Sequence, residues 1–294
     1  MRILVAQALG MCFGVRDALA ATERVLRPAE VTIHGQLVHN PEVTRRLAER
    51  GFGGLDEAGR GMAPATPAVL VTAHGISERA RRGLEAAGKT LIDTTCPLVR
   101  RAHHAAQLLA AEGRHVVVVG KRGHVEICGI VGDLASYTVV EAADEVSTYS
   151  HARLGVMCQT TTPSALAARV LGAVRAENPE ADVRYIDTIC QPTKDRQTAL
   201  AVLLRQADAV LVIGGRNSNN TRELVLRCEA SGVRAWHVEA AGELHAAWFA
   251  RVRVLGVTAG TSTLPQTIDG VVARLRAFGG RVEAGDASTH GEAA

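Results

Sequence analysis

Three of the six cysteines share a sequence context that suits metal-binding thiolates. Cys96 follows the segment LIDTT, Cys190 follows YIDTI, and Cys12 also stands between a predicted strand and a predicted helix. The sequence has no CxxC pair, and isolated thiols in a reducing compartment act as packing residues, nucleophiles or metal ligands. Three thiolates from three similar segments could hold zinc with one open position. An iron–sulfur cluster that leaves one iron without a protein ligand suits them better.

The other three cysteines have no counterparts at equivalent positions. Cys228 lies inside a predicted helix, and Cys158 ends a predicted strand. Because a buried free cysteine behaves as a small hydrophobic side chain, both are predicted to be packing residues, and so is Cys128.

Polar side chains recur at similar distances after the three aligned cysteines. One follows each cysteine by 27 or 28 residues: His39, His124 and Ser218. A second set follows the next strand of each repeat: His74, Thr160 and Ser262. Imidazoles, short hydroxyl or amide donors such as Asn220, and helix N-termini together suit a diphosphate. The sequence has no GxxxxGK[ST] loop, and GGRNSNN is not a GxGxxG fingerprint, so neither ATP nor NAD is indicated.

Glu126 is the carboxylate adjacent to this polar set, two residues after His124. Beside a pocket that binds phosphate and metal, its role would be to deliver protons. A surface glutamate at the start of a helix, stabilised by the helix dipole, explains the same residue equally well. The sequence leaves both interpretations open.

Short β-branched strands alternate with Ala- and Arg-rich helices, which predicts an α/β fold with parallel sheets. The predicted strands are Arg2–Ala6, Val31–Gly35, Ala68–Thr72, Thr90–Asp93, His115–Gly120, Arg153–Met157, Val183–Asp187, Ala209–Ile213 and Arg253–Thr258. The repeat predicts three similar βα units with small parallel sheets, arranged pseudo-threefold around a shared site at the carboxyl ends of the strands.

The predicted units are residues 1–96, 97–189 and 190–280. The N-terminal strand could close the first unit or, cyclically, the third. Residues 281–294 are small, polar and aperiodic, which is typical of a flexible tail.

Composition narrows the class of protein. A chain of 294 residues with 47% hydrophobic and 21% charged residues is expected to be globular, with two or three small domains. Aromatic residues at 3% and a net charge of +3 argue against nucleic-acid binding. No apolar stretch could cross a bilayer, and the N-terminus does not resemble a signal peptide. We therefore expect a cytoplasmic protein without nucleic-acid or membrane partners.

Many short motifs follow one another between Arg2 and about Gly280: GMCFGV, LVHNP, TAHGIS, DTTCPLV, GHVE, QTT, DTIC, NSNN and TAGTS. In this order they resemble the LytB family of 4-hydroxy-3-methylbut-2-enyl diphosphate reductases. The resemblance implies three α/β units around a central [4Fe–4S] cluster with one open iron and three cysteine ligands, Cys12, Cys96 and Cys190.

The resemblance also implies the remaining site residues. A small allylic diphosphate substrate would be bound by His39, His74, His124, Thr160, Ser218, Asn219, Asn220 and Ser262. Glu126 would donate protons, and Thr160 would position Glu126 and the substrate hydroxyl. The implied reaction is reductive dehydroxylation to isopentenyl and dimethylallyl diphosphate in the non-mevalonate isoprenoid pathway. A ferredoxin- or flavodoxin-type protein would supply the electrons.

The sequence departs from the family pattern at three positions, none of which removes a ligand or the acid. Val125 replaces the usual proline and is expected to loosen the loop of Glu126, Asn219 replaces a hydroxyl residue, and Asp195 replaces a commoner asparagine. Two other classes remain open: a zinc-dependent diphosphate hydrolase that uses the same cysteines, and a non-catalytic cluster-based sensor that binds a diphosphate.

Overall fold

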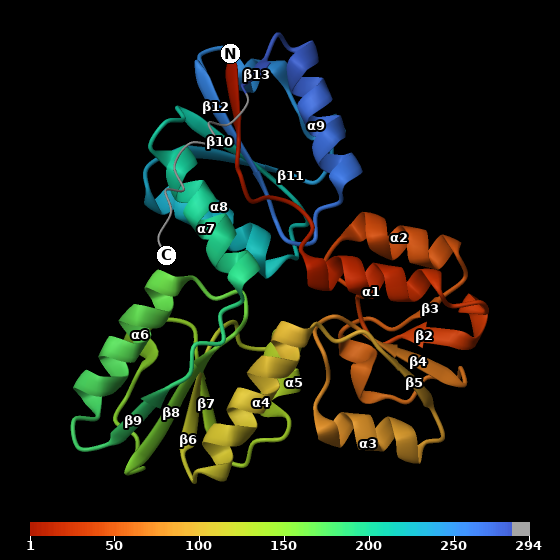
Figure 1. Ribbon diagram of the computed structural model, residues 1–294, viewed down its shortest axis with the longest axis vertical. Coiled ribbons are helices and arrows are strands. Elements are labelled where there is room, and N and C mark those ends of the chain that lie inside the picture. The colour runs from red at the N-terminus through yellow and green to blue at the C-terminus, as the bar shows by residue number, and fades with distance from the viewer. Residues whose placement is uncertain (284–294) are drawn as a thin grey trace, which may run out of the picture. The chain divides into compact units, whose positions relative to one another are not determined.

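The computed structural model describes residues 1–283, and within them three parallel sheets are flanked by helices (Figure 1). The chain divides into two compact units. The internal unit is Phe13–Thr193, and the terminal unit is Met1–Cys12 together with the described residues from Lys194 onward. The internal unit contains two four-stranded sheets, B and C, and the terminal unit contains the five-stranded sheet A. The predicted α/β fold with three small parallel sheets is confirmed.

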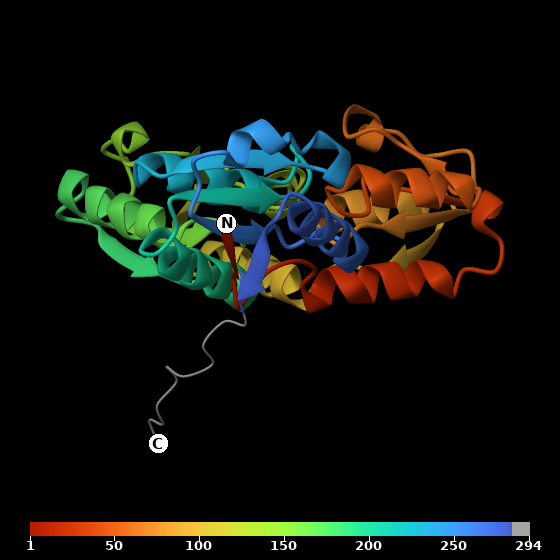
Figure 2. The ribbon, with the colours of Figure 1, turned by 90° about the horizontal axis from the view of Figure 1, so that it is seen from above.

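Sheet B has the strand order β3-β2-β4-β5, and every neighbouring pair is parallel. Its strands are β2 (Val31–Ile33), β3 (Gly53–Gly54), β4 (Ala68–Val71) and β5 (Thr90–Asp93). Its helices are α1 (Phe13–Glu23), α2 (Pro41–Glu49) and α3 (Glu78–Ala86), with short 3-10 turns η1 (Pro28–Glu30) and η2 (Ala58–Gly61). In Figure 2, α1 runs along the lower side of these strands.

Sheet C has the order β7-β6-β8-β9 and is also parallel. Its elements are β6 (His115–Val119), β7 (Tyr137–Val140), β8 (Arg153–Cys158), β9 (Asp182–Tyr185), α4 (Pro97–Ala111), α5 (Val125–Val131), α6 (Ser164–Glu177) and η3 (Ala143–Glu145). Val117 packs with Val170 of α6, whereas Val116 and Val118 pack with Leu109 of α4. Both faces of β6 are therefore buried, which explains its unbroken valine run.

Sheet A has the order β11-β10-β12-β1-β13. Its elements are β1 (Arg2–Val5), β10 (Ala209–Ile213), β11 (Arg234–Val238), β12 (Val254–Ala259), β13 (Arg281–Glu283), α7 (Gln191–Leu204), α8 (Asn219–Ala230), α9 (Pro265–Ala277), η4 (Ala241–Glu243) and η5 (Ala246–Phe249). Leu211 packs with Val271 of α9 on one face, and Val212 packs with Leu224 of α8 on the other. Helices therefore cover both faces of this sheet.

The three sheets repeat one strand order when β1 is counted after β12. We number the strands of each sheet from first to fourth in the order of the repeat. The spatial order is then second, first, third, fourth in every sheet, and β13 is added beyond the fourth strand of sheet A. Each aligned cysteine follows the fourth strand. Its backbone N–H donates to the carbonyl oxygen two residues after the third strand: Cys12 to Thr261 (3.1 Å), Cys96 to Ala73 (3.1 Å) and Cys190 to Thr160 (3.0 Å). The threefold repeat is therefore a repeat of backbone geometry.

The structure answers the question that the sequence left open at the N-terminus. β1 pairs with β12, so residues 2–5 belong to the sheet of the third unit. At the C-terminus the structure differs from the prediction. Arg281–Glu283, placed in the flexible tail, forms β13 and pairs with β1, because its short extended run meets an open edge. The remaining tail, 284–294, lies outside the described residues, and the boundaries near 96 and 189 stay predictions.

Most of the predicted strands agree with the structure to within one or two residues. β3, β7, β11 and β13 were not predicted. All four are edge strands with partly exposed residues, and β3 consists of two glycines, so none has the continuous apolar run that marks a buried parallel strand.

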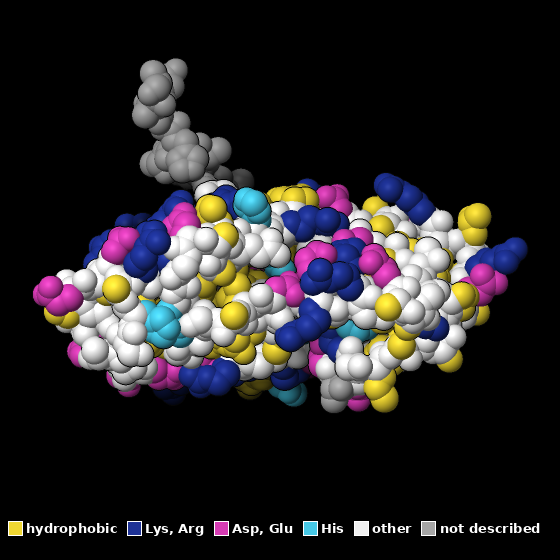
Figure 3. All heavy atoms as spheres, turned by 90° about the horizontal axis from the view of Figure 1, so that it is seen from below, with side chains coloured by type: hydrophobic (Ala, Val, Ile, Leu, Met, Phe, Trp, Pro, Cys, Tyr) yellow, Lys and Arg dark blue, Asp and Glu magenta, His cyan; other side chains and the backbone are white. Residues whose placement is uncertain are grey.

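Surface charges of opposite sign are mixed. On the face shown in Figure 3, Lys and Arg side chains lie among Asp and Glu side chains. Arg45, for example, pairs with Glu42 at 2.8 Å and with Glu49 at 2.5 Å. Among the helices of residues 1–283, none is long and apolar enough to cross a membrane.

Candidate active site

Three histidines from three different strand ends meet in the internal unit. His39 follows β2, His74 follows β4 and His124 follows β6. The rings of His39 and His74 are stacked with centroids 4.3 Å apart, and the His124 ring stands edge-on to both, at 5.2 and 5.7 Å. The sequence predicted that strand-end residues would converge, and these three do.

The histidine cluster is electrically neutral. Burial lowers the pKa of His39, lowers that of His74 well below its usual value, and lowers that of His124 to about 3. Nδ1 of His124 accepts the backbone N–H of Glu126 at 3.1 Å, which leaves the proton of a neutral ring on Nε2. Nδ1 of His74 is buried, and no hydrogen-bond partner for it occurs among residues 1–283. The cluster therefore offers neutral imidazole groups that a hydrogen-bonding ligand could engage.

Glu126 lies beside this cluster, in the first turn of α5, and its side chain is not a surface group. The residue is only 2% exposed. Oε1 accepts the backbone N–H of Thr160 at 2.7 Å, and Oε2 accepts its hydroxyl at 2.9 Å. Burial raises the pKa of Glu126 to about 7 in spite of these two hydrogen bonds. The alternative interpretation, a surface glutamate at a helix start, is wrong, and the carboxyl group is poised to exchange a proton near neutral pH.

The loop that carries Glu126 is well formed although Val125 replaces the usual proline. His124 caps α5 in an extended conformation (φ −64°, ψ 138°), and Val125 is the first residue of the helix. Cys128 N–H donates to the carbonyl oxygen of His124 at 2.9 Å. The loosening expected at this position is therefore not observed.

The repeated Asp-Thr-x-Cys motif builds the same turn before Cys96 and before Cys190. Asp93 Oδ1 accepts the N–H of Thr95 at 2.9 Å, and Asp187 Oδ1 accepts the N–H of Ile189 at 3.0 Å. The threonine after each aspartate donates its hydroxyl to the carbonyl oxygen that ends the neighbouring strand: Thr94 to Val71 and Thr188 to Cys158. The motif therefore fixes where each cysteine leaves its sheet.

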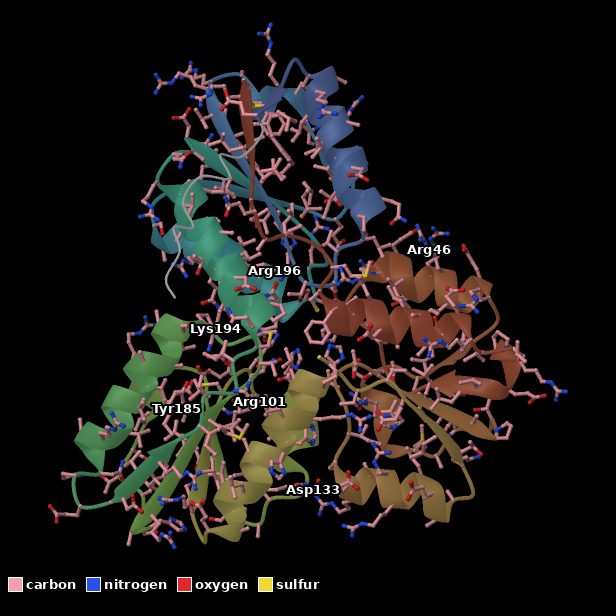
Figure 4. The ribbon with its side chains drawn as sticks, in the orientation of Figure 1. Arg46, Arg101, Asp133, Tyr185, Lys194 and Arg196 are labelled. Atoms are coloured by element: carbon pink, nitrogen blue, oxygen red, sulfur yellow. The ribbon has the colours of Figure 1, made fainter. Side chains whose placement is uncertain are left out.

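The two thiols of the internal unit have different surroundings. Cys96 is the N-cap of α4, and a Cβ on Gly14 of α1 would lie 2.5 Å from its Sγ. Sγ of Cys190 lies 3.1 Å from Oγ1 of Thr193. Arg101, on α4 near Tyr185 of β9 in Figure 4, donates to the carbonyl oxygen of Asp187 at 2.6 Å and so fixes the segment before Cys190.

The terminal unit gathers its predicted residues around the peptide group of Thr261. The N–H of Thr261 donates to Asn220 Oδ1 at 3.0 Å, and its carbonyl oxygen accepts the N–H of Cys12 at 3.1 Å. Ser262 comes next and is 5% exposed. Ser218 caps α8, of which Asn219 is the first residue. Cys12, Ser218, Asn219, Asn220 and Ser262 thus all lie at the carboxyl end of sheet A.

Thiols are the ligands that iron–sulfur clusters most often use, and the three aligned cysteines supply this type of donor. Cys12, Cys96 and Cys190 form no disulfide and are partly exposed, whereas Cys158 and Cys228 are buried as predicted. Cys128 is exposed, so its prediction as a packing residue is wrong; it lies on the outer side of the short helix α5. In the described part of the chain, no three His, Cys, Asp or Glu side chains are grouped as ligands of one ion.

Two further residues lie next to the histidine cluster and were not predicted from the sequence. Gln36 Oε1 bonds His39 Nδ1 at 3.1 Å. Arg60 donates to the carbonyl oxygen of Gly75, the residue after His74, at 3.1 Å. Neither belongs to the sets of polar residues that recur at fixed distances after the aligned cysteines, so no spacing signal could have identified them.

Comparisons with known proteins agree over nearly the whole chain. The family model described as LytB protein matches residues 3–276. A protein of Anaeromyxobacter sp. (strain K) named 4-hydroxy-3-methylbut-2-enyl diphosphate reductase is 38% identical over 281 residues, which are 95% of this chain and 100% of that protein. A protein of the same name from Aquifex aeolicus (strain VF5) is 32% identical over 93% of this chain and 96% of its own length.

Two solved structures share the fold. One, described as the (E)-4-hydroxy-3-methyl-but-2-enyl diphosphate reductase that ends the non-mevalonate pathway, is 32% identical, with a TM-score of 0.66 over 94% of this chain and 100% of that chain. The other, the reductase from Plasmodium falciparum, has a TM-score of 0.87 over 98% of this chain and 93% of that chain. At 24% identity the second supports the fold alone.

Proposed function

Since the chain belongs to the LytB family, we propose that it is a 4-hydroxy-3-methylbut-2-enyl diphosphate reductase, which forms isopentenyl and dimethylallyl diphosphate in the non-mevalonate isoprenoid pathway. The observation that carries the proposal is the buried Glu126, held by both donors of Thr160 beside three neutral imidazoles. A proton donor next to a set of hydrogen-bond donors suits the removal of a hydroxyl group from a diphosphate ester.

The thiolates of Cys12, Cys96 and Cys190 would hold a [4Fe–4S] cluster, with one iron left without a protein ligand. When bound, this cluster supplies the two electrons of the reduction, one at a time, and a Lewis-acidic position for the substrate oxygen. The repeated backbone hydrogen bond of each cysteine fixes the starting point of its side chain. A ferredoxin- or flavodoxin-type protein is the proposed electron donor.

The diphosphate is bound in this proposal by neutral side chains and helix N-termini. His39, His74 and His124 offer ring nitrogens, and α5 and α8 begin directly at His124 and Ser218. Ser218, Asn219, Asn220 and Ser262 add hydroxyl and amide donors, and Thr160 acts on the substrate hydroxyl instead. Free N–H groups at a helix start favour phosphate oxygens, so these positions combine two kinds of donor.

Glu126 is the proposed proton donor. With a pKa of about 7, it holds a proton in a substantial fraction of molecules at neutral pH and can release it to the leaving hydroxyl. Thr160 keeps both carboxyl oxygens in place, and in this proposal it also positions the substrate hydroxyl. The hydroxyl group takes up this first proton and leaves the allylic carbon as water. Two electrons and a second proton added to the allyl group complete the reduction.

Anaerobic purification, followed by iron and sulfide analysis and a reductase assay with a reduced viologen, tests the proposal. We expect four irons and four sulfides per chain and conversion of the substrate to both products. Zinc in place of iron would support the hydrolase alternative, and an intact cluster without turnover would support the sensor alternative. Either result would reject the proposed function.

A further inference from the structure

A basic side chain lies behind the histidine cluster. Arg60 belongs to η2, in the segment that connects β3 to β4. Its side chain is only 14% exposed. Arginine is rarely buried to this extent unless its charge is balanced and its donors are bound, so this position calls for an explanation.

The guanidinium group of Arg60 links the two turns that carry His39 and His74. One terminal nitrogen donates to the carbonyl oxygen of Gly75 at 3.1 Å. Nε donates to Nδ1 of His34, the residue after β2, at 3.2 Å. His34 Nε2 in turn lies 2.9 Å from the carbonyl oxygen of Arg60, which fixes both residues.

Glu57 extends the network to His39. It pairs with Arg60 at 3.2 Å, and its other oxygen accepts the backbone N–H of Gln36 at 3.0 Å. The side-chain oxygen of Gln36 then bonds His39 Nδ1 at 3.1 Å. Gly35 leaves the space for this ion pair: its φ is +98°, and a Cβ there would lie 3.0 Å from the carboxylate of Glu57 and 3.2 Å from Cδ of Arg60.

The ion pair is asymmetric with respect to the histidines. The side chain of Glu57 is 38% exposed, so solvent weakens its negative charge more than it weakens the buried positive charge. The charge of Arg60 acts on His74 and His124, where it adds to the effect of burial in lowering the pKa. At His39 the charges of Glu57 and Arg60 oppose each other. His74 and His124 are therefore affected by the positive charge of Arg60. At His124 the positive charge of Lys121 acts in the same direction.

We infer that Arg60 is a further residue of the anion-binding site, where it supplies a permanent positive charge and holds the turns of His39 and His74 together. The inference rests on the proposed binding of a diphosphate by these histidines. Neutral imidazoles must take up protons before they can balance an anion, whereas a guanidinium group is charged at every pH. Such a site favours a multiply charged diphosphate over an uncharged alcohol or a monoanion.

Binding of inorganic diphosphate to the full-length, anaerobically prepared protein tests this inference. We expect Arg60→Gln to weaken the affinity about tenfold, the effect of one charge at moderate distance in a partly buried site. The affinity should also depend less steeply on salt concentration, because one charge is lost. Arg60→Lys should keep most of the salt dependence, because it keeps the charge but not the forked hydrogen bonds.

Arg27→Gln is the matched control. Arg27 pairs with Glu30 at the same distance of 3.2 Å and the same i,i+3 spacing, but its side chain is 78% exposed and it precedes β2 rather than following it. Its removal should leave the diphosphate affinity unchanged. Circular dichroism and iron content of each variant establish that the fold is intact.

Each outcome decides the inference. Equal affinity of the wild type and Arg60→Gln would overturn it, and so would equal losses in Arg60→Gln and Arg60→Lys with an unchanged salt dependence. A wild-type protein that binds no diphosphate would overturn it too. If the reductase assay fails while diphosphate binding still depends on the charge of Arg60, the inference stands and only the proposed function is rejected.

Discussion

Thr160 donates to both carboxyl oxygens of Glu126, with its backbone N–H at 2.7 Å and its hydroxyl at 2.9 Å. Thr160 also holds the turn that carries Cys190, because its carbonyl oxygen accepts the N–H of Cys190 at 3.0 Å. One residue thus positions the proposed acid and a proposed cluster ligand. A displacement of Thr160 would disturb both.

Replacement of Glu126 by glutamine tests the acid. Glutamine keeps the size of the side chain and can still accept the N–H of Thr160, but it cannot donate a proton at neutral pH. We expect turnover to fall by about two to four orders of magnitude, the usual range for a general acid, with little change in substrate affinity. Steady-state kinetics and direct substrate binding measure the two effects. Near-normal turnover would assign the proton to another group.

The same variant should change the pH dependence of stability. The pKa of Glu126 is about 7 in the folded protein, against 4.5 for the free side chain, so folding favours the protonated form. Its contribution is fully present below pH 4.5 and is lost as the pH rises through 7. The wild type should therefore lose about 3 kcal/mol over this range relative to Glu126→Gln. Denaturant unfolding at pH 4.5 and pH 8 measures the difference, and equal pH profiles of the two proteins would contradict it.

Alanine at position 14 should disturb the thiol of Cys96. The added Cβ would lie 2.5 Å from Sγ, so the thiol must move. We expect less iron and sulfide per chain after anaerobic reconstitution. Gly172→Ala on α6 is the control, because a Cβ there meets nothing within 4 Å and should stabilise the helix by about 0.5–1 kcal/mol without changing the iron content. Full iron content in Gly14→Ala would show that the thiol has room elsewhere.

Serine replacements separate the aligned cysteines from the packing cysteines. Loss of Cys12, Cys96 or Cys190 should abolish the visible absorption of the cluster, since each thiolate would hold one iron. Cys228→Ser, in a buried position on α8, should keep the absorption and lower only the stability. Should Cys96→Ser retain a complete cluster, the proposed ligand set would be wrong.

Proline at position 125 should be tolerated. Val125 is the first residue of α5, where the N–H has no acceptor within the helix, and His124 already has the extended conformation that precedes proline (ψ 138°). We expect Val125→Pro to raise the free energy of unfolding by about 0.4–1 kcal/mol by restricting the unfolded chain, with unchanged turnover. A clear loss of stability or turnover would mean that Val125 makes a specific contact.

Much of the fold could be predicted because the chain repeats itself. Asp93-Thr94-Thr95-Cys96 and Asp187-Thr188-Ile189-Cys190 form the same hydrogen bonds. Between them, the central strands β6 and β8 are buried on both faces. Local hydrogen bonding and apolar runs depend on residues that are close in the sequence. The strands, the helices and the alignment of the cysteines could therefore be predicted from the sequence. Edge strands such as Tyr137–Val140 were not, because half-exposed residues carry no such run.

The sequence by itself determined the residue types of the site: three cysteines, three histidines and one carboxylate at recurring strand ends. Only the tertiary structure decided that Arg2–Val5 closes the third sheet, because hydrogen bonding between parallel strands does not depend on their distance along the chain. It also decided between the two interpretations of Glu126, since burial at 2% exposure, and not the identity of the residue, raises its pKa. The role inferred for Arg60 also required the tertiary structure. It depends on a hydrogen bond to the carbonyl oxygen of Gly75, which is 15 residues away in sequence and 3.1 Å away in space.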